Sequence, residues 1–304
     1  MEALERAREF VYKNARPVDI ARWNYLFENG ESSEVIKYLL SYQNKDGGFG
    51  NALEPDCWNK KSTPMQTWAA TKIINEIGLE NKSHPLISGT LEYLSSGDEF
   101  DGHRWHGLNT VQSNNDCPHA PWWSYLQKEE TGYNPTASLI GFILKYADEK
   151  SPLHILACEL AQEAYGYFKK NCPLESLHET ACFVDFYEYM KACNIQGLLD
   201  LKEFRNLLQQ QIKKVITYHT DSWSTDYVCK PSRFISSKKS DFYSGNEEIC
   251  DFEFHFIEQT QNLDGTWNVT WNWDAFPEQW SISENWWKSD IIIRNMAYMK
   301  AFEA

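Results

Sequence analysis

The sequence predicts an all-α protein built as an α/α toroid, in which roughly a dozen helices form two concentric rings. A motif that reads Gln-Asn-x-Asp-Gly-x-aromatic occurs at 43–49 and again 218 residues later at 261–267, each time after a stretch of helical character. Apolar residues recur three or four positions apart along most of the chain, which is the helical period. No segment alternates strongly enough to predict a β-sheet. An internal repeat combined with helical periodicity is typical of ring-shaped or stacked helical folds.

The first five expected helices follow in order along the chain. Apolar residues at 4–11 share one face, Pro17 opens a second helix, and a third covers 33–42. Ser62-Thr63-Pro64 combines a serine or threonine as the cap with a proline in the first turn, so it begins a fourth helix that runs to Gly78. A fifth helix is expected at about 84–95.

The second half of the chain holds the longest helical patterns. Asn134-Pro135 repeats the start signal of the fourth helix and precedes an apolar run that ends near Tyr146. Five further helices are expected at about 152–171, 174–194, 198–219, 248–260 and 284–302.

Three long irregular stretches, at about 50–62, 98–132 and 220–247, interrupt this pattern. They are rich in Trp, Pro, His and Asp, so we expect ordered loops over a cavity mouth. No low-complexity linker divides the chain, which favours a single domain that spans residues 1–304.

The repeated motif has a physical logic. Gly47 and Gly48 can take the positive φ that ends a helix or closes a tight turn, and Asp46 can bond nearby backbone N–H groups. Phe49 is expected to fold back onto the helix ends, while Gln43 ties the loop to a neighbouring helix. The same roles fall to the corresponding residues of the second copy, and a third, degenerate copy lies at 97–105.

The amino-acid composition argues against several classes of binding partner and against several cellular locations. The chain has 29 basic and 43 acidic residues, a net charge of −14, which argues against nucleic acid and anionic membrane surfaces. No apolar run reaches the ~18 residues of a transmembrane helix, and the charged start at 1–6 is unlike a signal peptide. Eight cysteines without a Cys-x-x-Cys pair predict free thiols and a cytoplasmic protein. The oligomeric state stays open.

Three motifs resemble a group of bacterial proteins described as similar to the terpenoid cyclase and protein prenyltransferase toroids. They are Asp-Gly-Gly-Phe-Gly-Asn-Ala-Leu-Glu-Pro-Asp at 46–56, Pro-His-Ala-Pro-Trp-Trp at 118–123, and Asn-Pro-Thr-Ala-Ser at 134–138. The pattern Gln-x-x-x-Gly-x-Trp/Phe in the two turns also resembles the repeat of squalene cyclases and prenyltransferase β subunits. The resemblance implies the toroid fold. The chain lacks the Asp-x-Asp-Asp acid, the Asp-Asp-x-x-Asp diphosphate motif and the Asp-x-Cys zinc motif of these enzymes.

The expected catalytic residues come from the irregular loops. Glu54 and Asp56 flank a proline, and two carboxylates this close can keep one proton between them, which makes either a candidate proton donor. The structural alternative is that one of them caps the next helix or pairs with an arginine. His119 is a candidate acid or base, and the neighbouring Trp122 and Trp123 are candidates for lining an apolar or sugar-binding pocket. The structural alternative is a loop held by aromatic packing, with His119 bonded to a backbone carbonyl. With Asp226 from a third loop, these residues are expected to face one cavity mouth.

Further residues are candidates for binding substrate. Trp223, Tyr227 and Arg233 lie with Lys230 in the third irregular loop, where the two cations can hold a phosphate or carboxylate or simply pair with nearby acids. Trp271 and Trp273 belong to a C-terminal tryptophan cluster whose faces suit a carbocation or a sugar, unless they only pack repeat turns.

No metal site or cofactor is predicted. Cys250 and His255, with Asp251 and Glu253 between them, do not supply four ligands in a closed arrangement, and neither do Asp226 and Cys229, so whether either pair binds a metal stays open.

The function expected from these residues is that of an enzyme acting on an isoprenoid or similarly apolar small molecule, by acid-initiated chemistry in a Trp-lined cavity. A carbohydrate-active (α/α) barrel enzyme with a carboxylate pair is one alternative. A non-catalytic ligand-binding toroid is the other.

Overall fold

The computed structural model describes residues 2–193, 195 and 197–303, and all regular secondary structure in this part of the chain is helical. It contains eleven α-helices and four short 310 helices, with isolated β-bridges and no strand. The predicted all-α class is therefore confirmed. None of the helices described is long and apolar enough to cross a bilayer.

The helices lie close to the ranges expected from the apolar periodicity. The α-helices are α1 (Glu2–Asn14), α2 (Pro17–Phe27), α3 (Ser32–Leu40), α4 (Pro64–Glu76), α5 (Pro85–Ser96), α6 (Thr136–Tyr146), α7 (Pro152–Asn171), α8 (Leu177–Cys193), α9 (Leu201–Val215), α10 (Glu247–Gln259) and α11 (Pro277–Glu303). The 310 helices are η1 (Gln112–Asp116), η2 (Pro121–Trp123), η3 (Thr220–Ser222) and η4 (Pro231–Arg233).

The chain divides into two compact units. Unit 1 comprises Met1–Leu39 and Ile216–Ala304, and unit 2 comprises Leu40–Val215. The expected single domain and the expected two concentric rings of helices describe the arrangement of the whole chain, and both stay predictions.

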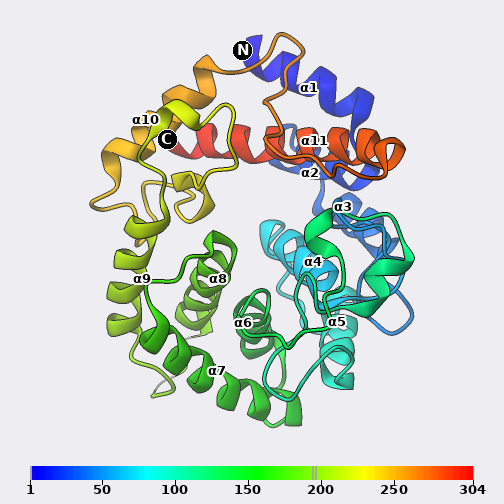
Figure 1. Cartoon of the computed structure of the whole chain (residues 1–304), viewed down its shortest axis with the longest axis vertical. Helices are drawn as coiled ribbons and strands as arrows, with labels where there is room; N and C mark the ends of the chain where they lie inside the picture. The colour runs from blue at the N-terminus through cyan, green and yellow to red at the C-terminus, as the bar shows by residue number, and fades with distance from the viewer. Residues whose placement is uncertain (1, 194, 196, 304) are drawn as a thin grey trace. The chain divides into compact units, whose positions relative to one another are not determined.

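Unit 2 is organised around α6, which packs against α4, α5, α7 and α8 (Figure 1). Ten of the 11 residues of α6 are buried, because neighbouring helices cover it on all sides. Gly141 permits the close approach of α8, since a Cβ atom there would lie 2.6 Å from the ring of Tyr189.

Unit 1 is organised around α11, which packs against α1, α2 and α10 (Figure 1). A buried network of charges joins α2 to α11. Asp19 accepts hydrogen bonds from Arg16 Nε at 2.6 Å and from Arg22 Nη1 at 3.2 Å, and Arg22 Nη1 also donates to Asp290 at 3.0 Å. Each buried charge therefore has a partner of opposite sign, which offsets the cost of removing it from water.

The first copy of the repeated turn ties its loop to α5. Gln43 Nε2 donates to the carbonyl oxygens of Gly47 at 2.9 Å and Pro85 at 3.2 Å. Gly47 has a φ of 86°, and a Cβ atom there would lie 2.1 Å from the carbonyl oxygen of Gly89. The Asp46 carboxylate accepts the backbone N–H two residues further on at 3.0 Å.

The second copy forms the same turn against α1. Gln261 Nε2 donates to the carbonyl oxygens of Gly265 at 3.1 Å and Ala3 at 2.9 Å. Gly265 has a φ of 89°, and its missing Cβ atom would lie 2.2 Å from the carbonyl oxygen of Arg6. Asp264 again accepts the N–H two residues on, at 3.1 Å. The predicted roles of the glutamine and the aspartate are confirmed in both copies, and so is the positive φ of Gly47 and Gly265; the positive φ expected of Gly48 is wrong.

The third, degenerate copy at 97–105 is a different turn. Asp101 accepts the N–H groups of His103 and Arg104, and Phe100 pairs with Trp105 across an isolated bridge. Trp105 is buried as expected of the aromatic position, but no glutamine ties this turn to a neighbouring helix.

α6 begins directly after Asn134-Pro135, as expected, but one expected cap and one expected helix start are wrong. Asn134 does not cap α6, because the N-cap is Pro135 and the Asn134 side chain accepts a bond from the Cys182 thiol instead. The last helix begins at Pro277 rather than near residue 284. Its first two turns mix polar and aromatic residues around the whole circumference, so no apolar stripe marks them.

Candidate functional site

Two of the predicted loops of unit 2 lie side by side. Trp58 N donates to Pro118 O at 2.9 Å, and Ala120 N donates to Asp56 O at 2.8 Å. These bonds make an antiparallel pair of Cys57 with His119. The structure thus brings the segment of Glu54 and Asp56 to that of His119 through the backbone.

Glu54 and Asp56 are integrated into the folded loop. The Glu54 carboxylate accepts the N–H of Asp56 at 2.9 Å, and the Glu54 N–H donates to Gln66 Oε1 at 2.8 Å. The cap of α4 is Thr63, whose hydroxyl accepts the N–H of Gln66 at 3.2 Å. Neither acid is therefore the cap of that helix. Asp56 is buried, with 4% of its surface exposed.

His119 is held at both ring nitrogens. Nδ1 lies 2.6 Å from the carbonyl oxygen of Cys117, and Nε2 lies 3.0 Å from Ser124 Oγ. A carbonyl oxygen only accepts, so Nδ1 carries the proton and Nε2 accepts from the serine in the neutral ring. This matches the structural alternative for His119. Trp123 beside it is fully buried, and Trp122 is half-buried.

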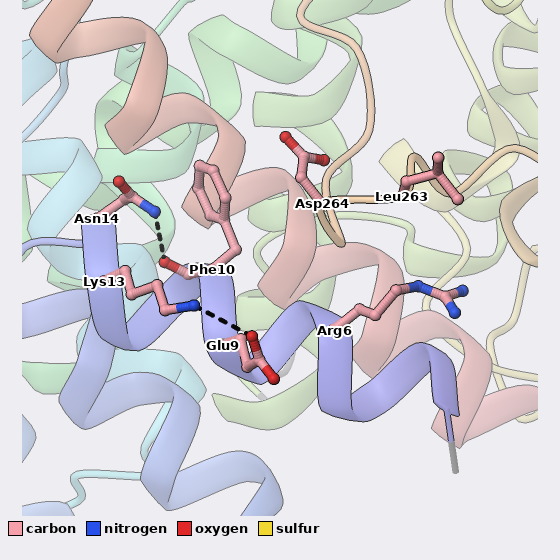
Figure 2. A pocket seen from close by; sticks show the side chains of 7 residues that line it. All are labelled: Arg6, Glu9, Phe10, Lys13, Asn14, Leu263 and Asp264. Atoms are coloured by element: carbon pink, nitrogen blue, oxygen red, sulfur yellow. Dashed lines mark hydrogen bonds and ion pairs between the residues drawn. The ribbon is translucent and has the colours of Figure 1, made fainter.

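Two polar hollows lie over the repeated turns. In unit 1, a hollow of about 340 Å³ lies between α1 and the second turn, and Figure 2 shows Glu9 and Lys13, an ion pair on α1, beside it with Leu263 and Asp264. In unit 2, a hollow of about 540 Å³ lies over the first turn and is lined by Asn44, Lys45, Asp46, Lys60, Lys61, Ser62, Asp98, Glu99 and Ser113. No tryptophan lines either hollow, and Phe10 is the one aromatic residue among the lining residues, so neither is the predicted Trp-lined cavity; no predicted catalytic residue lines either.

The third predicted loop lies in unit 1, and its residues differ in exposure. Asp226 is exposed, and its carboxylate accepts a bond from the neighbouring Thr225 hydroxyl at 3.0 Å. Tyr227 is 50% exposed and meets Trp271 edge-on, with ring centroids 5.5 Å apart. Trp271 Nε1 is buried and has no acceptor among the residues described. Trp273 is buried against another tryptophan of the C-terminal cluster, and Arg233 is half-buried at the end of η4.

The residue that the sequence analysis missed as an acid is Glu253 on α10. Its carboxylate accepts the N–H of Ser232 at 2.7 Å and the Ser232 hydroxyl at 2.6 Å. Burial raises the pKa of Glu253 to about 7, although the bonds from Ser232 and the charge of Lys230 act in the opposite direction. Glu253 shares the buried face of α10 with Cys250 and Ile257. In the sequence, the one feature that could have revealed this acid is a single glutamate within the apolar stripe of α10.

Beside this acid, an ammonium group rests on aromatic rings. Lys230 Nζ lies 4.6 Å from the ring centroid of Phe256 and 5.7 Å from that of Trp223. Trp223 is buried, and its indole N–H donates to Thr217 O at 2.9 Å. Lys230 makes no ion pair within the described residues, and burial lowers its pKa. Trp223, Lys230, Ser232, Glu253 and Phe256 are called the Glu253 site below.

A second buried carboxyl group lies in unit 2. Glu179 accepts the N–H of Tyr133 at 2.7 Å, and burial raises its pKa, with the nearby carboxylate of Glu130 adding to the effect. The guanidinium of Arg104 lies over the Tyr133 ring, 4.8 Å from its centroid. Arg104, Glu130, Tyr133, Tyr167 and Glu179 are called the Glu179 cluster.

The two residue pairs considered as possible metal ligands, Cys250 with His255 and Asp226 with Cys229, do not lie together with further ligands in the described part of the chain. No group of three or more His, Cys, Asp or Glu side chains in the described part of the chain could hold a metal ion. Cys250 is buried, whereas His255 is exposed and pairs with Glu258 on its own helix. Cys229 is likewise buried, whereas Asp226 is exposed.

Comparison with models of known protein families finds no match to this chain, nor do searches of curated proteins and of solved structures.

Proposed function

We propose that this protein binds an isoprenoid or similarly apolar small molecule and transforms it by acid-initiated chemistry at the Glu253 site. The observation that carries the proposal is the pairing of two features in one place. A buried carboxyl group has a pKa of about 7, and aromatic rings next to it already hold a positive charge. The raised pKa keeps a proton on the carboxyl group near neutral pH, where it can be donated to an alkene, and the aromatic faces stabilise the cation that results.

The chemistry follows from these side chains. At neutral pH about half of the Glu253 side chains carry a proton, because the pH then equals the pKa. Transfer of that proton to one carbon of an alkene breaks its π bond and leaves a cation on the other carbon. The faces of Trp223 and Phe256 stabilise such a cation by roughly 0.5–2 kcal/mol each. Loss of a proton from a neighbouring carbon back to the Glu253 carboxylate completes the cycle.

Access to the acid depends on Lys230. Glu253 is only 1% exposed, and the Lys230 side chain covers the aromatic rings beside it. We propose that the ligand displaces this ammonium group and that its cationic centre takes the same place. Tyr227 and Trp271 would contact the apolar chain, and Arg233 would hold a polar end group. Asp226 is exposed to water, so the acid role in unit 1 is assigned to Glu253, while the roles of Glu54, Asp56 and His119 in unit 2 stay predictions.

The test uses the whole chain with squalene and geranylgeraniol as probes. We expect tryptophan fluorescence to report binding, and mass spectrometry to detect conversion by the unmodified protein. Glu253→Gln keeps the shape and both Ser232 bonds, so it should bind the probes but lose turnover by at least about 100-fold. Glu248→Gln, an exposed change on the same helix, is the matched control. Full turnover by Glu253→Gln, or no binding by either probe, would overturn the proposal.

A carbohydrate-active enzyme remains the second candidate, because the Glu179 cluster favours it. A protonatable carboxyl group beside a second carboxylate, with an arginine and two tyrosines around them, is the arrangement that glycoside hydrolysis uses. Calorimetry with cellohexaose and chitohexaose distinguishes the candidates. Binding that is weakened by Glu179→Gln and unaffected by Glu253→Gln would support the second candidate.

A further inference from the structure

Two cysteines of unit 2 lie in contact although 60 residues separate them in sequence. Cys57 Sγ and Cys117 Sγ are 3.9 Å apart. The contact is imposed by the backbone, because the antiparallel bonds from Trp58 N to Pro118 O and from Ala120 N to Asp56 O fix the two loops side by side. The backbone pairing of the two loops therefore fixes the contact between the two cysteines.

The two thiols have different surroundings. Cys57 is fully buried, and its single thiol proton can go either to Asn114 Oδ1 at 3.4 Å or to Cys117 Sγ at 3.9 Å, whereas Cys117 is partly exposed and lies 3.2 Å from the Asn114 carbonyl oxygen. The hydrogen bond from the Cys57 thiol lowers the pKa of Cys117, and burial raises the pKa of Cys57. Cys117 is thus the more acidic and the more accessible thiol, which is the combination that makes a cysteine reactive toward oxidants.

We propose that Cys57 and Cys117 form a reversible redox pair, in which a hydroperoxide oxidises Cys117 and Cys57 then closes the disulfide. The Cys117 thiolate attacks the peroxide oxygen, the O–O bond breaks, and a sulfenic acid and water are formed after protonation. Cys57 sulfur then displaces the hydroxyl from Cys117, giving the disulfide and a second water. The two thiols lose two electrons and two protons, and one hydrogen peroxide becomes two waters.

The structure also indicates what the disulfide would change. The sulfur atoms must approach from 3.9 Å to the bonded distance of about 2.05 Å, so each sulfur atom moves by about 1 Å. Cys57 then no longer donates to Asn114, whose side-chain oxygen also accepts a bond from Asn59 at 3.0 Å. The oxidised form would therefore change the hydrogen bonding of the loop that carries Glu54 and Asp56. All of these groups lie in unit 2, so the proposal is independent of the Glu253 site.

The experiment treats the folded, fully reduced chain with one equivalent of hydrogen peroxide and maps its peptides without reductant. We expect one linked peptide pair, Cys57 with Cys117, lighter by two hydrogens and restored by dithiothreitol. Cys158, a partly exposed thiol on α7, is the internal control, and it should react at least about tenfold more slowly. Random linkage among the eight thiols, or equal reaction of Cys158, would overturn the proposal.

Two variants assign the order of events. In Cys57→Ser the sulfenic acid of Cys117 has no partner, so dimedone should label Cys117. In Cys117→Ser the buried Cys57 should stay unlabelled under the same conditions. Labelling of Cys57 in the second variant at the rate of Cys117 in the first would contradict the assignment. If a variant fails to fold, the peptide map of the unmodified chain still decides the proposal.

Discussion

The buried carboxyl group of Glu253 should make the stability of unit 1 depend on pH in a way that one substitution removes. Its pKa is about 7 in the folded chain against an ordinary value of 4.5. Each unit of difference corresponds to about 1.4 kcal/mol, so the full effect is about 3 kcal/mol. Between these two values the folded state keeps a proton that the unfolded state releases. The stability contribution is therefore highest below pH 4.5, falls as the pH rises through the window, and levels off above pH 7.

Glu253→Gln removes this titration while keeping the local contacts. The amide oxygen can accept the N–H of Ser232, and the amide N–H₂ can donate to the Ser232 hydroxyl. Urea unfolding at several pH values from 4.5 to 8, followed by fluorescence of the tryptophans, gives the free energy of unfolding of both proteins. The difference between the original chain and the variant should fall by about 3 kcal/mol across this range. The exposed change Glu248→Gln should leave the pH dependence as it is.

Lys230 supplies an independent check of the cause. Its positive charge lowers the pKa of Glu253, in opposition to burial. Lys230→Met should therefore raise the pKa of Glu253 further and extend the pH-dependent window upward. If Glu253→Gln leaves the pH dependence between 4.5 and 8 unchanged, the carboxyl group is not protonated near neutral pH, and the proposed acid chemistry fails with it.

The remaining predictions concern the repeated turns. Gly47→Ala and Gly265→Ala should each lower the free energy of unfolding by at least ~3 kcal/mol, because the new methyl group meets a backbone carbonyl at a positive φ. Gly166→Ala is the control, because Gly166 lies in the open middle of α7, and it should stabilise the chain by about 0.5–1 kcal/mol. An equal loss of unfolding free energy in all three variants would refute the steric argument. Gln261→Ala removes two donated bonds and the one accepted from Arg6, so thermal unfolding should show a loss of about 1–3 kcal/mol. An unchanged melting temperature would mean that water replaces the glutamine.

The repeated turns could be read from the sequence because their chemistry is local. Only glycine accepts the φ values of Gly47 and Gly265, and the aspartate before each of them bonds a backbone N–H two residues away. The helices were predicted for the same reason, since apolar spacing follows from the geometry of one helix. The start of α11 was missed where apolar and polar residues are mixed around the helix.

The candidate sites depended on contacts between segments that are distant in sequence. The sequence identified the irregular loops of Asp56, His119 and Trp223 as special, but not that His119 is held at both nitrogens. It also did not identify Glu253 as an acid, because the pKa of a carboxyl group is set by burial and by neighbours such as Lys230, which lies 23 positions earlier.

The sequence by itself determined the helical class, most helix boundaries and the two matching turns, since each depends on residues within a few positions of one another. Only the tertiary structure decided which carboxyl group is buried and which thiols touch. Glu253 becomes an acid because the loop before it covers α10, and Cys57 meets Cys117 because two loops pair across 60 residues. Desolvation and sulfur contact are properties of the packed chain, and no local pattern encodes them.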